Sequence, residues 1–331
     1  MTDELKPLRT WSHLIGQRRK PSEYEIVSTG LLWHARGEEV PFEVEGASYM
    51  NDWVMRHRDN SAVGHPDWDS FRDPDELVYR TYNILQDGQE SYIDGLLDQY
   101  DSEGHDESLA AAWLDVLEAL YTPGRYLVHT TQMASAYLVH MAPASTICNC
   151  AAFQTADALR WVSRIAYRTA SLAKAHPDRS FGDSERATWE TAPAWQGYRE
   201  LMERALVAYD WAEAFVALNL VALPSVAEGF HRALALSARR NDDTLAALMA
   251  EAALRDADRS RRWSQALVGH MLDVESNRSQ LLAWLDTWTP RGTAAVEAYV
   301  AALPEVPGAA EAGSAALRGF HASAGLAASD G

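Results

Sequence analysis

The chain has 331 residues, of which 47% are hydrophobic, and its 29 Lys and Arg against 47 Asp and Glu give a formal net charge of −18. This length is sufficient for one or two sizeable buried cores. Because nucleic-acid binding depends on basic contacts that release counterions, an acidic chain without a face dense in Lys and Arg is not expected to bind nucleic acid.

The N-terminal segment MTDELKPLRTWSHL carries charges where a signal peptide needs an apolar stretch. The sequence also lacks a run of about 18 consecutive apolar residues, the length that a transmembrane helix requires. We therefore expect a cytoplasmic, soluble protein with no membrane partner.

Residues 1–72 are predicted to form an extended N-terminal arm. They contain four prolines, scattered glycines, and tryptophans without helical spacing, namely Trp11, Trp33, Trp53 and Trp68. Large aromatic side chains that an arm cannot bury within itself usually lie on another surface. The arm is therefore expected to pack on the body of the chain or on a partner.

Residues 73–303 are predicted to form an all-α domain of long helices. The segment Asp73-Pro74-Asp75-Glu76 combines a capping side chain, a proline and an acid three residues after the cap, which is typical of a helix start. Apolar residues at helical spacing follow to about residue 100 and recur over 107–141, 144–174, 184–222, 225–240, 242–272, 276–288 and 293–302. No stretch shows sustained two-residue alternation closed by a hairpin turn, so a helix bundle is favoured.

Residues 304–331 are rich in Ala and Gly and nearly devoid of large apolar groups. Such a composition does not offset the entropy lost on ordering, so the segment is predicted to be a mobile tail. Leu317 and Phe320 are the two side chains in it expected to dock locally.

The cysteines, Cys148 and Cys150, lie two apart in the segment ICNC. They are too close for an ordinary disulfide and too few for a tetrahedral zinc site, and they are interpreted as reduced thiols packed in a helix. The sequence also lacks a G-x-S-x-G motif, a glycine-rich phosphate loop and a cysteine with a histidine to orient it.

Long-helix bundles often carry metal sites in which two helices each supply a Glu and two others each supply Glu-x-x-His, because residues three apart share one helical face. That spacing occurs once in this sequence, as Glu228 and His231 with a glycine between them. A single copy is interpreted as a surface Glu and His on an amphipathic helix rather than as metal ligands.

Two other segments resemble each other: both place Arg-Trp shortly after Ala-Asp on a predicted long helix. They are ADALRW (156–161) and ADRSRRW (257–263). Chance is one explanation, since Ala is abundant and the chain has 12 Trp. The other is an internally duplicated bundle in which Trp fills a position that once held a smaller polar side chain.

Several segments are similar to one known family: KPLRTWSHL (6–14), KPSEYEIV (20–27), LVYRTYNILQDGQESY (77–92), MAPASTICN (141–149), QTADALRWV (154–162) and DWAEAFVALNLV (210–221). They resemble the β subunit of bacterial multicomponent (soluble di-iron) monooxygenase hydroxylases, in the group of toluene, alkene and isoprene monooxygenases. The similarity covers roughly residues 5–302, in order and without large gaps.

The resemblance implies a ferritin-like helical subunit that is related by duplication to the catalytic α subunit and lacks its carboxylate-bridged di-iron centre. The α subunit carries Glu-x-x-His twice, each in an Asp-Glu-x-Arg-His context. The matching places in this chain, which we call the lost-ligand positions, are Ala158, Trp161, Ser260 and Trp263. Because neither Ala nor Trp ligates iron, no metal and no catalytic residue are expected here. The pair at 228 and 231 falls on the helix that should supply a single Glu, so it is read as coincidence.

The resemblance therefore assigns the monooxygenase activity to an assembly of several proteins. Electrons pass from NADH through an FAD and iron–sulfur reductase and a Rieske 2Fe-2S ferredoxin to di-iron in the α subunit, which inserts one oxygen atom of O2 into a small apolar substrate. A small effector protein docks on the hydroxylase. This chain would act as a scaffold in a dimer of αβγ protomers. Its residues do not distinguish arenes, alkenes and isoprene as substrates, because the substrate pocket belongs to the α subunit.

Obligate subunit interfaces are large and enriched in aromatic side chains and arginine. The residues predicted to lie at the subunit interface are Arg9, Trp11, His13, Tyr24, Trp33, Trp53, Trp68 and Arg80. Two other functions remain open at this stage. One is a stand-alone ferritin-like di-iron protein that binds iron by itself, and the other is a helical interaction protein with no oxygenase connection.

Overall fold

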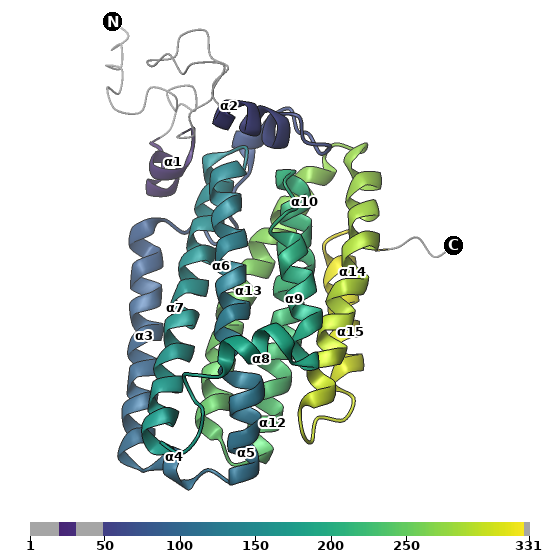
Figure 1. Ribbon diagram of the computed structural model, residues 1–331. Helices are drawn as coiled ribbons and strands as arrows, with labels where there is room; N and C mark the ends of the chain where they lie inside the picture. The colour runs from purple at the N-terminus through teal and green to yellow at the C-terminus, as the bar shows by residue number, and fades with distance from the viewer. Residues whose placement is uncertain (1–19, 31–48, 328–331) are drawn as a thin grey trace, which may run out of the picture.

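The computed structural model describes residues 20–30 and 49–327, and within them every regular element is a helix, which confirms the predicted all-α, long-helix bundle (Figure 1). The long helices are α3 (Tyr79–Ser102), α6 (Gly124–Met141), α7 (Ser145–Ala175), α9 (Pro193–Ala205), α13 (Thr244–Leu272) and α14 (Asn277–Ala302). Shorter elements between them are α4 (His105–Ser108), α5 (Ala111–Val116), the π-helical turn η4 (Leu117–Tyr121) and α8 (Glu185–Thr191).

One continuous helix, residues 211–240, runs through the core and is called the central helix. It comprises α10 (Trp211–Phe215), η5 (Val216–Ala222), α11 (Leu223–Ser225), η6 (Val226–Ala233) and α12 (Leu234–Arg240), of which η5 and η6 are π-helical. It is long and apolar enough to cross a membrane, but 89% of its most apolar window is buried inside the protein. Its apolar character is therefore explained by burial in the bundle core.

The helices pack closely where glycine allows it. A Cβ atom on Gly197 of α9 would lie 2.7 Å from the Cα of Ala295 in α14, and one on Gly124 of α6 would lie 2.1 Å from the ring of Phe230. Real Cβ atoms do not approach so closely, so these two glycines set the spacing between α9 and α14 and between α6 and the central helix.

The predicted helix start at Asp73 is wrong: α3 begins at Tyr79. The carboxylate of Asp73 accepts hydrogen bonds from the backbone N–H groups of Asp75 and Leu77 and closes a turn instead. Glu76 then adopts a positive φ of 47°, which stops a right-handed helix from propagating through this segment.

Other predicted boundaries also shift. The helix expected over 107–141 is interrupted at Thr122 and Pro123, and the one expected over 184–222 is interrupted before Pro193 and again over residues 206–210. Conversely, the breaks expected at 222–225 and 288–293 do not occur, because the central helix continues through Pro224 and α14 through Pro290. Pro224 is buried, so packing around it holds it in a helix that the local signal would end, whereas Pro290 lies on the exposed side of α14.

The predicted mobile tail is wrong over residues 309–323, which form α15 (Ala309–Ser323) against the central helix and α14. The expected docking of Leu317 and Phe320 is confirmed, since both are buried. In addition, His321 Nε2 lies 2.7 Å from the carbonyl oxygen of Leu220. Small Ala and Gly side chains let this helix approach the bundle, a packing gain that composition alone does not contain.

The described part of the arm forms short helices where an extended chain was expected. They are α1 (Glu23–Ser28), α2 (Tyr49–Val54), the π-helical turn η2 (Met55–Asp59) and the 3-10 turn η3 (Trp68–Ser70). In α1, Ser22 and Glu25 form a reciprocal capping box, with each side chain accepting from the backbone N–H of the other. Figure 1 places α1 and α2 at the end of the bundle opposite α4 and α5.

Candidate functional site

Three of the four lost-ligand positions surround one small cavity. Ala158 and Trp161 lie in the middle of α7, and Ser260 lies in the middle of α13. They line a cavity of about 60 Å³. The fourth position, Trp263, is also buried, but its ring packs on Phe215 with the two centroids 5.6 Å apart.

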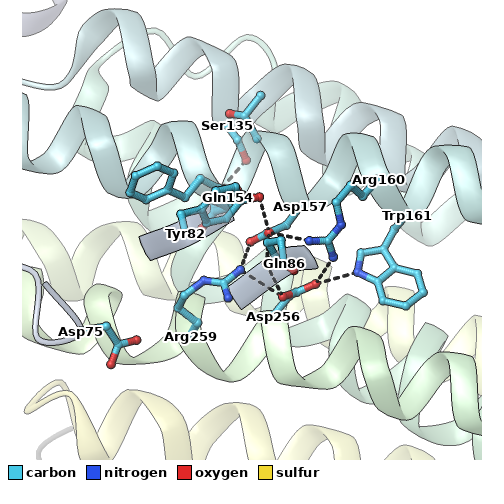
Figure 2. Close-up of polar contacts among 12 residues, drawn as sticks. Asp75, Tyr82, Gln86, Ser135, Gln154, Asp157, Arg160, Trp161, Asp256 and Arg259 are labelled. Carbon is cyan, nitrogen blue, oxygen red and sulfur yellow. Dashed lines mark hydrogen bonds and ion pairs between the residues drawn. The ribbon is translucent and has the colours of Figure 1, made fainter. Parts of the chain in front are cut away.

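Beside this cavity two buried carboxylates face each other. Asp157 belongs to α7 and Asp256 to α13 (Figure 2). Arg259 donates a hydrogen bond to Asp157 Oδ2 and another, of 3.0 Å, to Asp256 Oδ1. Arg160 donates to Asp256 Oδ2 at 2.9 Å. Two negative and two positive side chains thus neutralise one another, and together with Tyr82, Gln86 and Trp161 we call them the buried charge cluster.

Helix α3 contributes the neutral donors of this cluster. The Tyr82 hydroxyl donates to Asp157 Oδ1 at 2.8 Å. The amide of Gln86 donates to Asp157 Oδ1 at 2.9 Å and to Asp256 Oδ1 at 3.1 Å. Since each carboxylate receives several hydrogen bonds, the desolvation of the two charges is partly compensated and three helices are joined at one point.

Trp161 is one of the lost-ligand positions expected from the resemblance, and its side chain acts as a hydrogen-bond donor. Its indole Nε1 donates to Asp256 Oδ2 at 2.9 Å. An indole N–H is a donor with no lone pair for a metal, whereas an imidazole has one. With Ala158 on the same helix, this position now supplies a hydrogen bond to a carboxylate and has no atom to give to iron. The residues present therefore do not fit a di-iron centre at this place.

A second polar chain crosses the core next to the cavity. Gln154 of α7 donates to the hydroxyl of Ser135 in α6 at 2.9 Å. Asn219 of the central helix donates to Gln154 Oε1 at 2.9 Å and to the hydroxyl of Ser264 in α13 at 3.0 Å. Satisfied polar networks of this kind fix the register of neighbouring helices.

Burial controls the electrostatics of the site. It raises the pKa of Asp157 to about 6, an effect to which the neighbouring Asp256 adds and which Arg259 opposes. Burial also raises the pKa of the Tyr82 phenol well above its ordinary value. His231 lines the same cavity, and burial lowers its pKa to about 4, so its imidazole is neutral at pH 7.

The reading of Glu228 as a surface residue is wrong, because its side chain is buried. It pairs with Arg261 of α13 at 2.7 Å and with Arg232 at 2.8 Å. Both carboxylate oxygens of Glu228 are therefore engaged by guanidinium groups, which disfavours a metal role for the Glu-x-x-His spacing.

Sequence reasoning missed the buried charge cluster. A signal was nevertheless present, since an Asp is followed three residues later by an Arg on both long helices, as Asp157 and Arg160 on α7 and as Asp256 and Arg259 on α13. Residues three apart share one helical face, so each pair presents both charges to the same neighbour. Nothing in the sequence indicates Gln86 as the third partner.

Four of the predicted interface residues, Arg9, Trp11, His13 and Trp33, lie outside the described residues. Of the other four, two join the arm to the rest of the chain near α3. The Tyr24 hydroxyl accepts from the backbone N–H of Asp73 at 3.0 Å, and Arg80 pairs with Glu23 of α1. Tyr24 is buried, so it offers no surface to a partner.

The other two predicted interface residues, Trp53 and Trp68, also contact the helices of the chain's own bundle. Trp53 donates to the hydroxyl of Tyr137 at 3.3 Å and packs on Tyr209, with the ring centroids 4.8 Å apart. Trp68 meets Trp211 edge to face at 5.0 Å. The described part of the arm is therefore anchored on the bundle, one of the two outcomes expected for its aromatic side chains.

An exposed apolar surface on α3 and α7 was not foreseen from the sequence. Large side chains that point outward there are Tyr79, Ile84, Leu85, Tyr92, Leu159 and Tyr167. Ile84, Leu159 and Tyr167 line an open groove of about 980 Å³ between the two helices. Soluble chains rarely expose so many large apolar groups together, so this surface, which we call the α3/α7 face, is the strongest candidate for a partner contact.

The two cysteines lie on α7 as free thiols, as predicted; Cys150 is buried and Cys148 is half-buried. Burial raises the pKa of Cys148 to about 11, so it stays a thiol at neutral pH.

Together, the fold and the site define a long-helix bundle of the ferritin-like type whose core holds a buried cluster of ion pairs with an indole donor. Residues 45–275 match the family of methane, phenol and alkene hydroxylases. A curated relative, the hydroxylase component subunit beta of the toluene-4-monooxygenase system of Ectopseudomonas mendocina, is 48% identical over 298 residues, which span 90% of this chain and 91% of that protein. The chain therefore belongs to the methane/phenol/alkene hydroxylase family, and the resemblance to hydroxylase β subunits is confirmed.

Solved structures agree with this assignment. A chain of toluene 4-monooxygenase, solved with toluene bound in its resting active site, has a TM-score of 0.86 and 47% identity, and the match covers 90% of this chain and 98% of that one. A chain of the phenol hydroxylase from Pseudomonas sp. OX1 has a TM-score of 0.83 at 19% identity, covering 99% and 98% of the two chains. The second likeness shows the fold alone.

Proposed function

We propose that this chain is the non-catalytic β subunit of the hydroxylase component of a multicomponent monooxygenase whose di-iron centre lies in a separate α subunit. The proposal rests on the residues found where the resemblance implies the two Glu-x-x-His sites: Ala158 and Ser260 in place of Glu, and Trp161 and Trp263 in place of His. The buried charge cluster beside them joins three helices through hydrogen bonds and ion pairs between side chains. The name of the 48% identical relative, a hydroxylase component subunit beta, supports the same role.

The proposed assembly is a dimer of αβγ protomers in the cytoplasm. In it, NADH, an FAD-containing reductase and a Rieske 2Fe-2S ferredoxin supply electrons, an effector protein docks on the hydroxylase, and a small hydrocarbon is oxidised with O2. Toluene is the substrate named for the relative, and alkenes and isoprene are the other members of the proposed substrate class. The substrate pocket would lie in the α subunit.

The α3/α7 face is the proposed contact surface for another subunit of the hydroxylase. Its apolar side chains surround a groove that also contains Arg160 and Arg164. Both arginines are held by Glu90, at 2.9 Å in the case of Arg160. A rigid apolar surface with fixed charges in its groove is the usual composition of an obligate interface core and its polar surroundings.

The assembly is tested by native mass spectrometry of the full chain, purified from its own host through a small affinity tag. The expected result is a complex with two copies each of three different chains and with iron only in the largest. A lone chain or a homo-oligomer would refute the β-subunit proposal. Iron bound to that species would instead support a stand-alone ferritin-like di-iron protein.

The contact surface is tested by Leu159→Glu, which places a charge on the α3/α7 face. Leu159 is 53% exposed, so the substitution should leave the fold of the chain intact. Burying the new carboxylate against a partner should weaken co-purification of the other subunits by roughly tenfold or more. Leu236→Glu on α12 is the matched control, because Leu236 is 46% exposed and lies away from this groove. Equal recovery of partners with both variants would exclude the α3/α7 face as the interface.

A further inference from the structure

A separate group of potential metal ligands lies where the arm meets the bundle. His65 is in the loop before η3, His270 is in the last turn of α13, and Asp273 follows that helix. Each offers one ligand atom, and these atoms lie within 4.8 Å of one another. Within residues 20–30 and 49–327, no other trio of His, Cys, Asp or Glu side chains comes this close together.

The hydrogen bonding of His270 orients a lone pair towards Asp273. His270 Nε2 lies 3.1 Å from the carbonyl oxygen of Asp67. Because a carbonyl oxygen can only accept, Nε2 carries the hydrogen, and Nδ1 of the neutral ring keeps its lone pair. That Nδ1 lies 3.8 Å from Asp273 Oδ2. The lone pair of His270 Nδ1 and the carboxylate of Asp273 therefore face each other, and both could bind a cation placed between them.

His65 completes the trio. Its ring faces that of His270, with the two centroids 3.8 Å apart. His65 Nδ1 accepts from the backbone N–H of Asp67 at 3.0 Å, so this nitrogen also carries a lone pair. The N–H of Asp67 is exposed and can turn to water if a metal takes that lone pair. The backbone carbonyl of Asp67 thus positions the imidazole of His270 through the nitrogen that would not bind the metal, as outer-shell groups commonly do in metal sites.

The loop that carries His65 is held in place. The side chain of Asn277, at the start of α14, donates to the carbonyl oxygen of Gly64 at 2.8 Å and accepts from its N–H at 3.3 Å. The ring of Trp68 packs beside His65, with the centroids 5.3 Å apart. Binding would therefore require little reordering of the chain, which favours affinity.

Charge and access also suit a cation. The imidazole of His270 is largely buried, whereas the side chain of Asp273 is 72% exposed and leaves an open side. Water can fill the remaining coordination position from that side.

We propose that His65, His270 and Asp273 bind a divalent transition-metal ion of the zinc class, with water as the fourth ligand, and that this ion links the arm to the end of α13. Two imidazoles and one carboxylate are a donor set that such ions take readily. The site lies on different residues from the lost-ligand positions, and it stands whether or not the proposed β-subunit role is correct.

The test uses the full chain in the complex with which it purifies, isolated without a polyhistidine tag and titrated with Co²⁺ and Zn²⁺. We expect the visible absorption of four-coordinate Co²⁺ at about one equivalent per chain, and its displacement by Zn²⁺. His65→Gln, His270→Gln and Asp273→Asn should each weaken Co²⁺ binding by roughly tenfold or more. His140→Gln and Asp258→Asn, which change an exposed His and an exposed Asp elsewhere, should have no effect.

A second measurement separates loss of the site from misfolding. Zn²⁺ should raise the thermal unfolding midpoint of the unaltered chain and leave that of the Asp273→Asn variant unchanged, since a metal that binds only the folded state stabilises it. The absence of the Co²⁺ band from the unaltered chain would overturn the proposal. Equal Co²⁺ binding by all five variants would overturn it as well, because the metal would then be bound elsewhere.

Discussion

Asp157 allows a sharp test of the buried charge cluster, because its pKa is raised, whereas an aspartate beside arginines usually has a lowered pKa. Burial raises its pKa from an ordinary 3.8 to about 6. Between these two values the folded chain binds a proton that the unfolded chain does not. The contribution of Asp157 to the free energy of unfolding is therefore fully present below about pH 3.8 and is lost as the pH rises through about 6.

The size of the effect follows from the two pKa values. The difference between 3.8 and about 6 corresponds to roughly 3 kcal/mol. Asp157→Asn keeps the shape of the side chain and cannot titrate. The lost contacts with Tyr82 and Arg259 add an offset that is the same at every pH, so only the pH dependence carries the test.

The assay is urea unfolding of the full chain and the variant at a series of pH values from about 4 to 7. The unfolding free energy of Asp157→Asn relative to the unaltered chain should rise by roughly 3 kcal/mol across this range. If the two curves stay parallel, Asp157 does not titrate as a buried acid and the account of the cluster fails.

Asp243 provides a matched control of opposite sign, because it is also a buried aspartate. Burial by itself would raise its pKa, but Arg168, His105 and Trp113 together outweigh this and lower it. The stability that Asp243 contributes is present above about pH 3.8 and is lost as the pH falls through its folded pKa. Asp243→Asn should therefore be less stable than the unaltered chain at pH 7, and the deficit should shrink in acid.

Three further substitutions probe the hydrogen bonding of the cluster and the packing of the helices. Trp161→Phe removes the indole N–H that donates to Asp256 and should lower the free energy of unfolding by about 1–3 kcal/mol; unchanged stability would mean that the hydrogen bond contributes nothing. Gly197→Ala brings a Cβ to 2.7 Å from the Cα of Ala295 and should destabilise the chain by about 1–3 kcal/mol in thermal unfolding. Gly95→Ala, where a Cβ meets nothing within 4 Å, should instead stabilise α3 by about 0.5–1 kcal/mol, and equal effects of the two alanines would contradict the close approach of α9 and α14.

The parts of the fold that could be predicted from the sequence are those that depend on the local spacing of apolar residues. The helices expected over 144–174 and 242–272 are present as α7 and α13, because their apolar residues repeat along one face. The helix start expected at Asp73 failed although its motif was complete. A capping side chain stabilises a tight turn as well as a helix end, and the left-handed backbone of Glu76 selects the turn.

The lost-ligand positions stay a prediction from the resemblance, but the chemistry of their side chains is fixed by the sequence: Ala158 and Trp161 offer no ligand atom to iron in any fold. The residues that pair in the buried charge cluster could not be predicted from the sequence. Asp157 and Arg259 are 102 residues apart, and only the packing of α7 on α13 brings them together. The same holds for His65 and His270, which are joined through the backbone of Asp67.

The sequence by itself determined the all-helical character and the family, because the periodicity of apolar residues and the identity of characteristic segments are local properties. The tertiary structure decided the continuous central helix, the docking of α15 and the exposed α3/α7 face. These features depend on which surfaces meet: a proline or an alanine-rich segment stays helical when neighbouring helices pack around it, and an apolar side chain is exposed or buried according to what lies opposite it.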